Sequence, residues 1–310
     1  MWSAARALHR LAEPPGLRFM SDRLFVALQQ VLPQRALTEM MGALARSQGG
    51  AATTAAIRWF VRRYGVDMSE AANPDIAAYA SFNDFFTRAL REDARPMAVA
   101  EWICPVDGAI SQFGPIRGDQ IFQAKGHGYS TRALVGGDAT LAAQFQDGDF
   151  ATLYLSPRDY HRIHMPCAGR LQRMVHVPGD LYSVNPATAR GVPGLFARNE
   201  RVVCVFDTAH GPFVLVLVGA TIVGSMATVW HGVVNPPRVG VVREWRYADQ
   251  AIALDQGAEM GRFLLGSTVV MLWPRLGGGL CFNRAWSAGA AIRMGQAMAS
   301  LSTPASPTVA

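Results

Sequence analysis

From about residue 100 to residue 272, the chain consists of short apolar runs separated by Gly, Pro and Asp. Many of these runs are rich in Val, Ile and Thr, which favour strands, and the residues between them favour turns. Such a series predicts a mainly antiparallel β body. The expected strands are Trp102–Val106, Ala109–Phe113, Ala151–Leu155, Gly169–His176, Val202–Phe206, Phe213–Val218, Thr221–Val229, Gly240–Trp245 and Ser267–Leu272.

Before residue 100, apolar residues recur at helical spacing instead. We therefore expect an α+β protein in which N-terminal amphipathic helices precede the mainly antiparallel β-rich body. The first two stripes fit either helices packed on the body or interfacial helices among lipid headgroups, and the third fits a packed helix. A further helical segment is expected within residues 73–97, with Asn83 and Asp84 near its start. The stripes are Leu24, Phe25, Leu28, Val31 and Leu32; Leu37, Met40, Met41 and Leu44; and Ile57, Phe60, Val61 and Tyr64.

The positive charge is concentrated at the N-terminal end of the chain. Residues 1–63 contain nine Arg and three Asp or Glu, which accounts for the whole net charge of +6. These arginines alternate with apolar residues, a pattern that favours an anionic membrane surface over nucleic acid as the partner. Residues 208–237 carry no formal charge and are long enough for a membrane span, but their glycines and β-branched runs favour two buried strands with a turn.

The composition also limits the cofactors. Lys125 is the only lysine, so only one residue could form the internal Schiff base of a pyridoxal phosphate enzyme. Four cysteines lie far apart without a Cys-x-x-Cys pair, which fits reduced thiols in a cytosolic protein. Charged residues interrupt the apolar stretch after Met1, so no secretory signal peptide is expected.

The stretch Gly266-Ser267-Thr268 places two hydroxyl groups inside an apolar, strand-forming run. One interpretation is a strand with a bulge at Gly266. The other is chemical, because a serine hydroxyl beside a strained Gly-Ser peptide bond can attack the preceding carbonyl.

Two further motifs carry groups suited to catalysis. His161 and His164 lie three residues apart between Ser156-Pro157 and Pro166, and a helical turn would place both imidazoles on one face. With Cys167 they resemble part of a zinc site, but no fourth ligand is evident, so proton transfer is the preferred role. Asp107-Gly108 is typical of a hairpin turn. Asp107, His164 and Ser267 together also provide the residue types of a catalytic triad.

These motifs resemble the phosphatidylserine decarboxylase family in its bacterial, membrane-associated form. The similar stretches run in family order from about residue 60 to residue 272. They are Pro105–Gly108, Gln123–His127, Tyr154–Pro166, Val177–Leu181, Leu195–Arg201, Val218–Thr221, Glu259–Phe263 and Leu265–Thr268.

The resemblance implies an enzyme whose cofactor is a pyruvoyl group made from its own chain. Ser267 would attack the Gly266 carbonyl, and the precursor would split into a β chain, residues 1–266, and an α chain, residues 267–310. The new terminal pyruvoyl group would form a Schiff base with phosphatidylserine, so neither pyridoxal phosphate nor a metal is expected. His164 is implied as the base in self-cleavage, Asp107 as the carboxylate that orients it, and His161 as the proton donor in decarboxylation.

The resemblance also implies a location and partners. Tyr154 and Lys125 are assigned to the lining of the substrate pocket. The expected organisation is a membrane-associating module (1–65), a catalytic domain (66–284) and a flexible tail (285–310), at the cytoplasmic face of the cell membrane. The partners would be phosphatidylserine in an anionic membrane and the two chains of one precursor. Whether the enzyme also forms a homodimer is left undecided by the sequence.

Two rival functions remain at this point. A serine hydrolase acting on membrane lipids would use the same Asp107, His164 and Ser267, although the chain lacks the usual Gly-x-Ser-x-Gly motif around the nucleophile. A lipid-binding module without catalysis would explain the basic helices but not the paired histidines.

Overall fold

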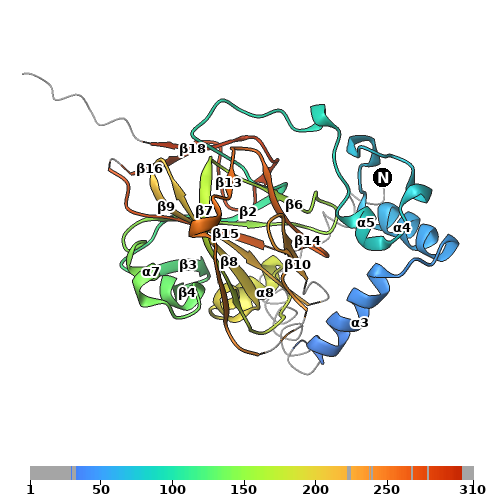
Figure 1. Cartoon of the computed structure of the whole chain (residues 1–310), viewed down its shortest axis with the longest axis horizontal. Coiled ribbons are helices and arrows are strands. Elements are labelled where there is room, and N and C mark those ends of the chain that lie inside the picture. The colour runs from blue at the N-terminus through green and yellow to red at the C-terminus, as the bar shows by residue number, and fades with distance from the viewer. Residues whose placement is uncertain are drawn as a thin grey trace, which may run out of the picture.

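The computed structural model describes residues 29, 33–221, 225–236, 238, 240–266, 268–277 and 279–301. Within them, a body of antiparallel sheets carries a group of helices at one side, formed by α3 (Gln34–Arg46), α4 (Ala51–Tyr64) and α5 (Phe82–Phe86) (Figure 1). This arrangement confirms the predicted α+β class. The predicted strands are present, although several differ from their expected bounds by a few residues.

The largest sheet of the described residues has nine strands in the order β12-β7-β8-β9-β15-β5-β2-β17, with β13 also paired to β7. All pairings between these strands are antiparallel. The bounds are β2 (Gly108–Pro115), β5 (Asp149–Tyr154), β7 (Gly169–Val177), β8 (Arg201–Thr208), β9 (Gly211–Val218), β12 (Arg243–Arg246), β13 (Ala253–Leu254), β15 (Thr268–Trp273) and β17 (Ala291–Ile292).

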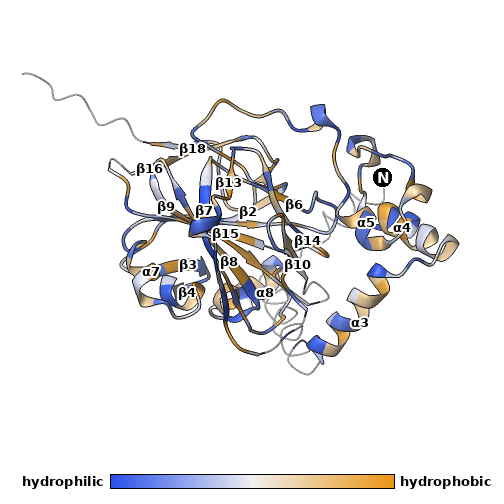
Figure 2. Cartoon of the chain, in the orientation of Figure 1, coloured by the Kyte–Doolittle hydropathy of each residue, from blue (hydrophilic) through white to orange (hydrophobic). Residues whose placement is uncertain are grey.

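Strand β15 lies near the centre of this sheet, between β5 and β9, and all six of its residues are buried. Its side chains alternate between two hydrophobic clusters, as the two-residue period of a strand requires. Val269 and Met271 pack in one cluster, whereas Val270 and Leu272 pack in the other. The apolar colouring of the central strands in Figure 2 follows from this burial on both faces. Strand β15, which begins at Thr268, is therefore buried on both faces of the sheet.

Smaller sheets complete the body. The strand order is β11-β10-β14-β6 in one, β1-β18-β16 in another and β3-β4 in a third. Their bounds are β1 (Trp102–Ile103), β3 (Gln120–Ala124), β4 (His127–Ser130), β6 (Arg162–His164), β10 (Met226–Thr228), β11 (Gly232–Val233), β14 (Glu259–Phe263), β16 (Leu280–Phe282) and β18 (Ala297–Leu301). Four short helices lie among the strands: α6 (Thr131–Leu134), α7 (Ala139–Ala143), α8 (Pro186–Gly191) and α9 (Leu195–Arg198).

The helices before the body follow the second and third predicted stripes. Helix α3 (Gln34–Arg46) begins after Pro33, and α4 (Ala51–Tyr64) ends at Gly65, whose left-handed conformation (φ 68°) suits glycine. The first stripe lies outside the described residues. The predicted segment within 73–97 is mostly short turns around α5 (Phe82–Phe86), where Ser81 and Asp84 form a capping box.

The uncharged stretch 208–237 forms β9, β10 and β11 where it is described, which confirms two buried strands in β9 and β10. Across the described ranges, the helices are all too short or too polar to cross a membrane.

The structure corrects the prediction of a flexible tail from residue 285. Strand β18 pairs with both β1 and β16, and the Met298 side chain is fully buried. The Ala- and Ser-rich composition suggested a loose segment, but backbone pairing and the burial of Met298 and Ala299 override that tendency. Residues 302–310 of the predicted tail lie outside the described residues.

Candidate active site

Gly266 lies at the end of the chain segment that links β14 to β15. A Cβ atom added to Gly266 would lie 2.2 Å from Nε2 of His161, which is far inside contact distance. Glycine is therefore required here by close approach, because any side chain would displace the imidazole. The neighbouring Ser267, the predicted nucleophile and cleavage residue, lies outside the described residues.

His161 is fully buried beside Gly266 and packs its ring on Phe86, with 4.0 Å between ring centroids. Among the described residues, neither ring nitrogen has a hydrogen-bond partner. Burial, with a smaller contribution from the Arg88 charge, lowers the pKa of His161 to about 3. The imidazole is therefore neutral at pH 7. A buried polar ring with no well-aligned hydrogen bond and only a minor contribution from the Asp159 backbone, set against a predicted cleavage site, is suited to contact a reacting group.

His164 ends strand β6 and occupies a different environment. Its Nδ1 lies 2.8 Å from the Gly257 carbonyl oxygen and its Nε2 lies 3.0 Å from the Tyr160 hydroxyl. The carbonyl can only accept a hydrogen bond, so Nδ1 carries the proton. Burial raises the pKa of Tyr160 to about 12 and lowers that of His164. Tyr160 therefore donates to the Nε2 lone pair of a neutral imidazole.

The two histidines do not share a face, contrary to the predicted helical turn. Residues 162–164 form β6, which pairs with β14, and residues three apart on a strand point to opposite sides. The flanking prolines suggested a turn, but pairing with β14 decides the conformation. His161 consequently faces Gly266 and Phe86, whereas His164 faces Tyr160 and Gly257.

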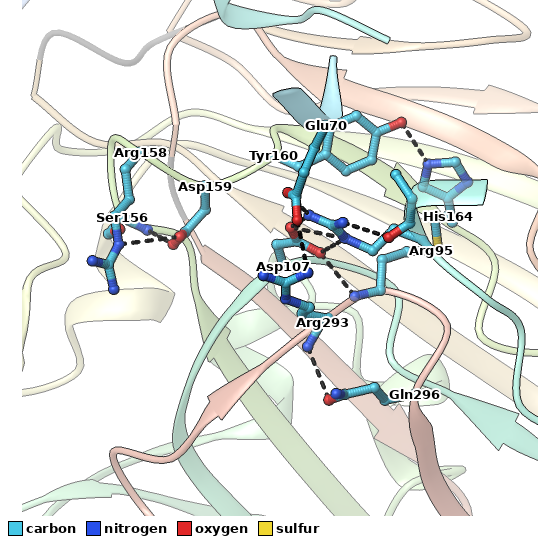
Figure 3. A network of polar contacts seen from close by, with 12 residues as sticks. Glu70, Arg95, Asp107, Ser156, Arg158, Asp159, Tyr160, His164, Arg293 and Gln296 are labelled. Atoms are coloured by element: carbon cyan, nitrogen blue, oxygen red, sulfur yellow. Dashed lines mark hydrogen bonds and ion pairs between the residues drawn. The ribbon is translucent and has the colours of Figure 1, made fainter. Parts of the chain in front are cut away.

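Asp107 is buried, but its carboxylate is not hydrogen-bonded to His164. It accepts one bifurcated hydrogen bond from Arg95 Nε, at 2.9 Å to Oδ1 and 3.2 Å to Oδ2, a further one from Arg95 Nη2, and one at 2.9 Å from the Met294 backbone. Figure 3 shows Arg95 lying between Asp107 and Glu70, which accepts a 2.7 Å bond from the same guanidinium. Asp107 therefore connects the chain before the predicted cleavage site to a segment that follows it.

An Asp107→Ala variant should be markedly less stable. It removes one partner of a buried ion pair and leaves the Met294 amide without its acceptor. The expected loss is about 3 kcal/mol, at the lower end for broken buried pairs because Glu70 still neutralises Arg95. Urea unfolding of the uncleaved chain measures it. Asp93→Ala is the control, because its pair with Arg91 is exposed on both sides. Equal unfolding midpoints for the two variants would contradict the proposed role.

Gly108, the second residue of the Asp-Gly motif, does not form the expected hairpin turn. It starts β2, and a Cβ added to it would lie 2.3 Å from the Tyr154 carbonyl oxygen. Glycine is used here for a close approach between β2 and β5. This packing brings Asp107 next to Tyr154, whose backbone also pairs with Thr268 immediately after the predicted cleavage site.

A cavity of about 490 Å³ opens beside these residues. Asp107, Tyr154 and Tyr160 line it, together with four arginines. Tyr154 also lines a second cavity of about 330 Å³, which contains Lys125. The structure thus places Tyr154 at both cavities and Lys125 at the second one only. The arginines are Arg88, Arg95, Arg158 and Arg293.

A metal site is not evident in the part of the chain that the structure describes, where groups of three or more His, Cys, Asp or Glu suited to one metal ion are absent. Cys167, considered as a ligand with the histidines, is buried, and burial raises the pKa of its thiol to about 12. Close packing instead leaves the neutral His161 ring directly against the Gly266 backbone.

Several residues of the site were missed by sequence reasoning. Tyr160 lies inside the histidine motif but carried no assigned role, and Gly257 acts through its backbone, which no side-chain pattern indicates. Arg95 and Arg88 belong to the Phe-rich segment interpreted only as a helix. Their spacing to the catalytic motifs has no local regularity, so only the folded chain brings them together.

Comparison with known proteins agrees with this geometry. The family model described as phosphatidylserine decarboxylase matches residues 82–300, and a second model, described as PSD, matches residues 24–65. The chain is 74% identical over 280 residues to the phosphatidylserine decarboxylase proenzyme of Methylibium petroleiphilum and 71% identical to that of Delftia acidovorans. Each alignment covers 90% of this chain and 98% of the relative. The chain therefore belongs to the phosphatidylserine decarboxylase family.

Proposed function

We propose that this chain is the precursor of a pyruvoyl-dependent decarboxylase that converts phosphatidylserine to phosphatidylethanolamine and CO₂. The relatives are named proenzymes of phosphatidylserine decarboxylase, which supports both the substrate and a maturation step. The observation that carries the proposal is the buried, neutral His161 ring packed directly against Gly266. A serine hydrolase has no need for a glycine backbone at that position.

Self-cleavage between Gly266 and Ser267 would begin when the Ser267 hydroxyl attacks the Gly266 carbonyl. We propose His164 as the base, because its Nε2 carries the available lone pair. Tyr160 now donates to that lone pair, so this hydrogen bond must be exchanged for one from Ser267. Asp107 would act on His164 through its charge rather than through a hydrogen bond, since Arg95 and Met294 occupy its oxygens. Oriented attack in a rigid pocket can provide effective molarities of roughly 10⁵ M or more.

In decarboxylation, the pyruvoyl group derived from Ser267 would supply the carbonyl that accepts electrons as CO₂ leaves. His161, which is neutral in the precursor, would take up a proton when the substrate is bound and then deliver it to the substrate carbon from its position beside Gly266. The Phe86 ring covers the imidazole and excludes water from it. Tyr154 would help to shape the pocket from its place on β5 next to Thr268.

We also propose that residues 1–65 associate with an anionic membrane at its cytoplasmic face. Met40 and Leu44 on α3 and Trp59 on α4 are 53%, 57% and 62% exposed, which is unusual for large apolar side chains. Arg58 and Arg62 lie on α4 with Trp59 and would attract anionic headgroups. A peripheral enzyme of this kind meets its substrate without extracting both acyl chains from the bilayer.

The assay that tests this function follows CO₂ and phosphatidylethanolamine released from phosphatidylserine in mixed micelles. Wild-type protein should form both, and a fluorophosphonate should leave it unlabelled. His161→Gln should still split into two chains, but its decarboxylation should fall by about 10²–10⁴-fold, as expected for loss of a general acid. His127→Gln, a change on β4 away from Gly266, should keep wild-type activity. Release of fatty acid without CO₂, or labelling of Ser267, would favour the hydrolase instead.

A further inference from the structure

Arg88 is a buried cation whose role the proposed chemistry leaves unexplained. Only 5% of the residue is exposed, and its Nε is buried without a hydrogen-bond partner among the described residues. The guanidinium packs over the Phe85 ring, 5.3 Å from the centroid. Burial lowers the pKa of Arg88, but an arginine remains charged at neutral pH. A buried charge normally has a partner, so this one points to an anion that arrives from outside the chain.

The other arginines of the 490 Å³ cavity differ from Arg88 in this respect. Arg95 is paired with Asp107 and Glu70, and Arg293 also pairs with Glu70. Arg158 is 66% exposed in its side chain and lies 3.7 Å from Asp159. Within the described residues, Arg88 is the cavity arginine for which no carboxylate lies within ion-pair distance. Among carboxylates, Arg88 is attracted only over a longer range, by Asp107 and Glu70, so its buried charge can still bind a ligand in this cavity.

We propose that Arg88 binds the phosphodiester of the lipid headgroup, an inference that rests on the proposed function. The headgroup carries two anions, a carboxylate and a phosphate. The carboxylate loses its charge as CO₂ leaves, so an arginine bound to it would stabilise the ground state more than the transition state. The phosphodiester keeps its charge throughout and is present in both substrate and product. A planar guanidinium also matches two phosphate oxygens at once.

The location of Arg88 agrees with a headgroup whose phosphate binds Arg88 while its reacting carbon lies elsewhere. Arg88 lines the cavity, and its charge is close enough to His161 to lower the pKa of that imidazole. The reacting carbon would lie at Gly266 and His161, against the apolar Phe86 ring. The phosphate would lie in the cavity, a few bonds away. Its negative charge would offset that of Arg88 and make protonation of His161 easier when substrate is present.

The test compares two inhibitors that share an amine and differ in the phosphodiester: glycerophosphoethanolamine and ethanolamine. With wild-type enzyme, glycerophosphoethanolamine should inhibit at a lower concentration. Arg88→Gln should raise its inhibition constant roughly 10- to 100-fold, as expected for lost hydrogen bonds to a charged group, and leave that of ethanolamine unchanged. The inhibition constant of glycerophosphoethanolamine for Arg88→Lys should lie between the values for wild type and for Arg88→Gln. Arg91→Gln, an exposed arginine on the same segment, should match wild type.

Each failure has its own meaning. If wild type releases CO₂ but both inhibitors bind it equally, the phosphate site is wrong although the decarboxylase is right. If Arg88→Gln raises the KM for phosphatidylserine but not the inhibition constant of glycerophosphoethanolamine, Arg88 binds the carboxylate and the proposal is overturned. If Arg88→Gln fails to split into two chains, or if wild type releases no CO₂, binding of glycerophosphoethanolamine is measured directly, as the broadening of its ³¹P signal by wild-type protein and by Arg88→Lys. Broadening by wild type that weakens in Arg88→Lys supports the site, and equal or absent broadening overturns it.

Discussion

A Ser267→Ala variant is expected to remain a single chain of full length and to release no CO₂ from phosphatidylserine. Both losses have one cause, because Ser267 would supply both the hydroxyl that attacks Gly266 and the carbon atoms of the pyruvoyl group. The effect should be all or none, since alanine offers no nucleophile and no route to a carbonyl. A denaturing gel and the CO₂ assay measure the two losses on the same preparation.

Thr268→Val is the matched control for this experiment. Thr268 carries the adjacent hydroxyl, which is buried and has no hydrogen-bond partner among the described residues. Valine keeps the shape of threonine and favours a strand, so β15 should be preserved. This variant should still split into two chains. Two chains from Ser267→Ala, or one chain from Thr268→Val, would show that the reactive hydroxyl has been assigned to the wrong residue.

Gly266→Ala should slow self-cleavage by on the order of 10²-fold, the penalty typical of moving reacting groups by about 1 Å. The added Cβ would lie 2.2 Å from His161 Nε2, so the imidazole or the backbone must move. His161 is fully buried and packed on Phe86, which leaves the ring little room to retreat. The rate of appearance of the two chains after synthesis measures the effect.

A double variant separates crowding from other causes. Gly266→Ala combined with His161→Ala removes the ring that the new methyl group would meet, and should recover much of the cleavage rate. Gly277→Ala, where an added Cβ meets nothing within 4 Å, should cleave like wild type. If the double variant cleaves as slowly as Gly266→Ala alone, contact with His161 is not the reason that glycine is needed.

Much of the β body could be predicted because its signals are local. The β-branched runs that became β8, β9 and β15 are buried on both faces, and apolar runs between turn residues indicate such strands directly. The amino-acid composition gave a wrong prediction in a segment whose structure is determined by strand pairing. Residues 297–301 look like a loose tail in isolation, yet they form β18 because β1 and β16 offer unpaired backbone beside them.

The site was predictable in its residue types but not in its contacts. The motifs contain His161, His164 and Gly266, and they resemble one family closely enough to assign roles. Their sequence gives no indication that Arg95 rather than His164 would bind Asp107. The orientation of His164 depends on a backbone carbonyl, that of Gly257, 93 residues away. Such contacts arise from tertiary packing and have no local pattern.

The most direct measurement is the intact mass of freshly purified, active wild-type protein, before and after borohydride treatment. The account predicts two chains that correspond to residues 1–266 and 267–310. It also predicts that the smaller chain begins with a carbonyl that borohydride reduces, adding two hydrogen atoms and abolishing activity. Active protein that consists of one unbroken chain, with no carbonyl for borohydride to reduce, would contradict it.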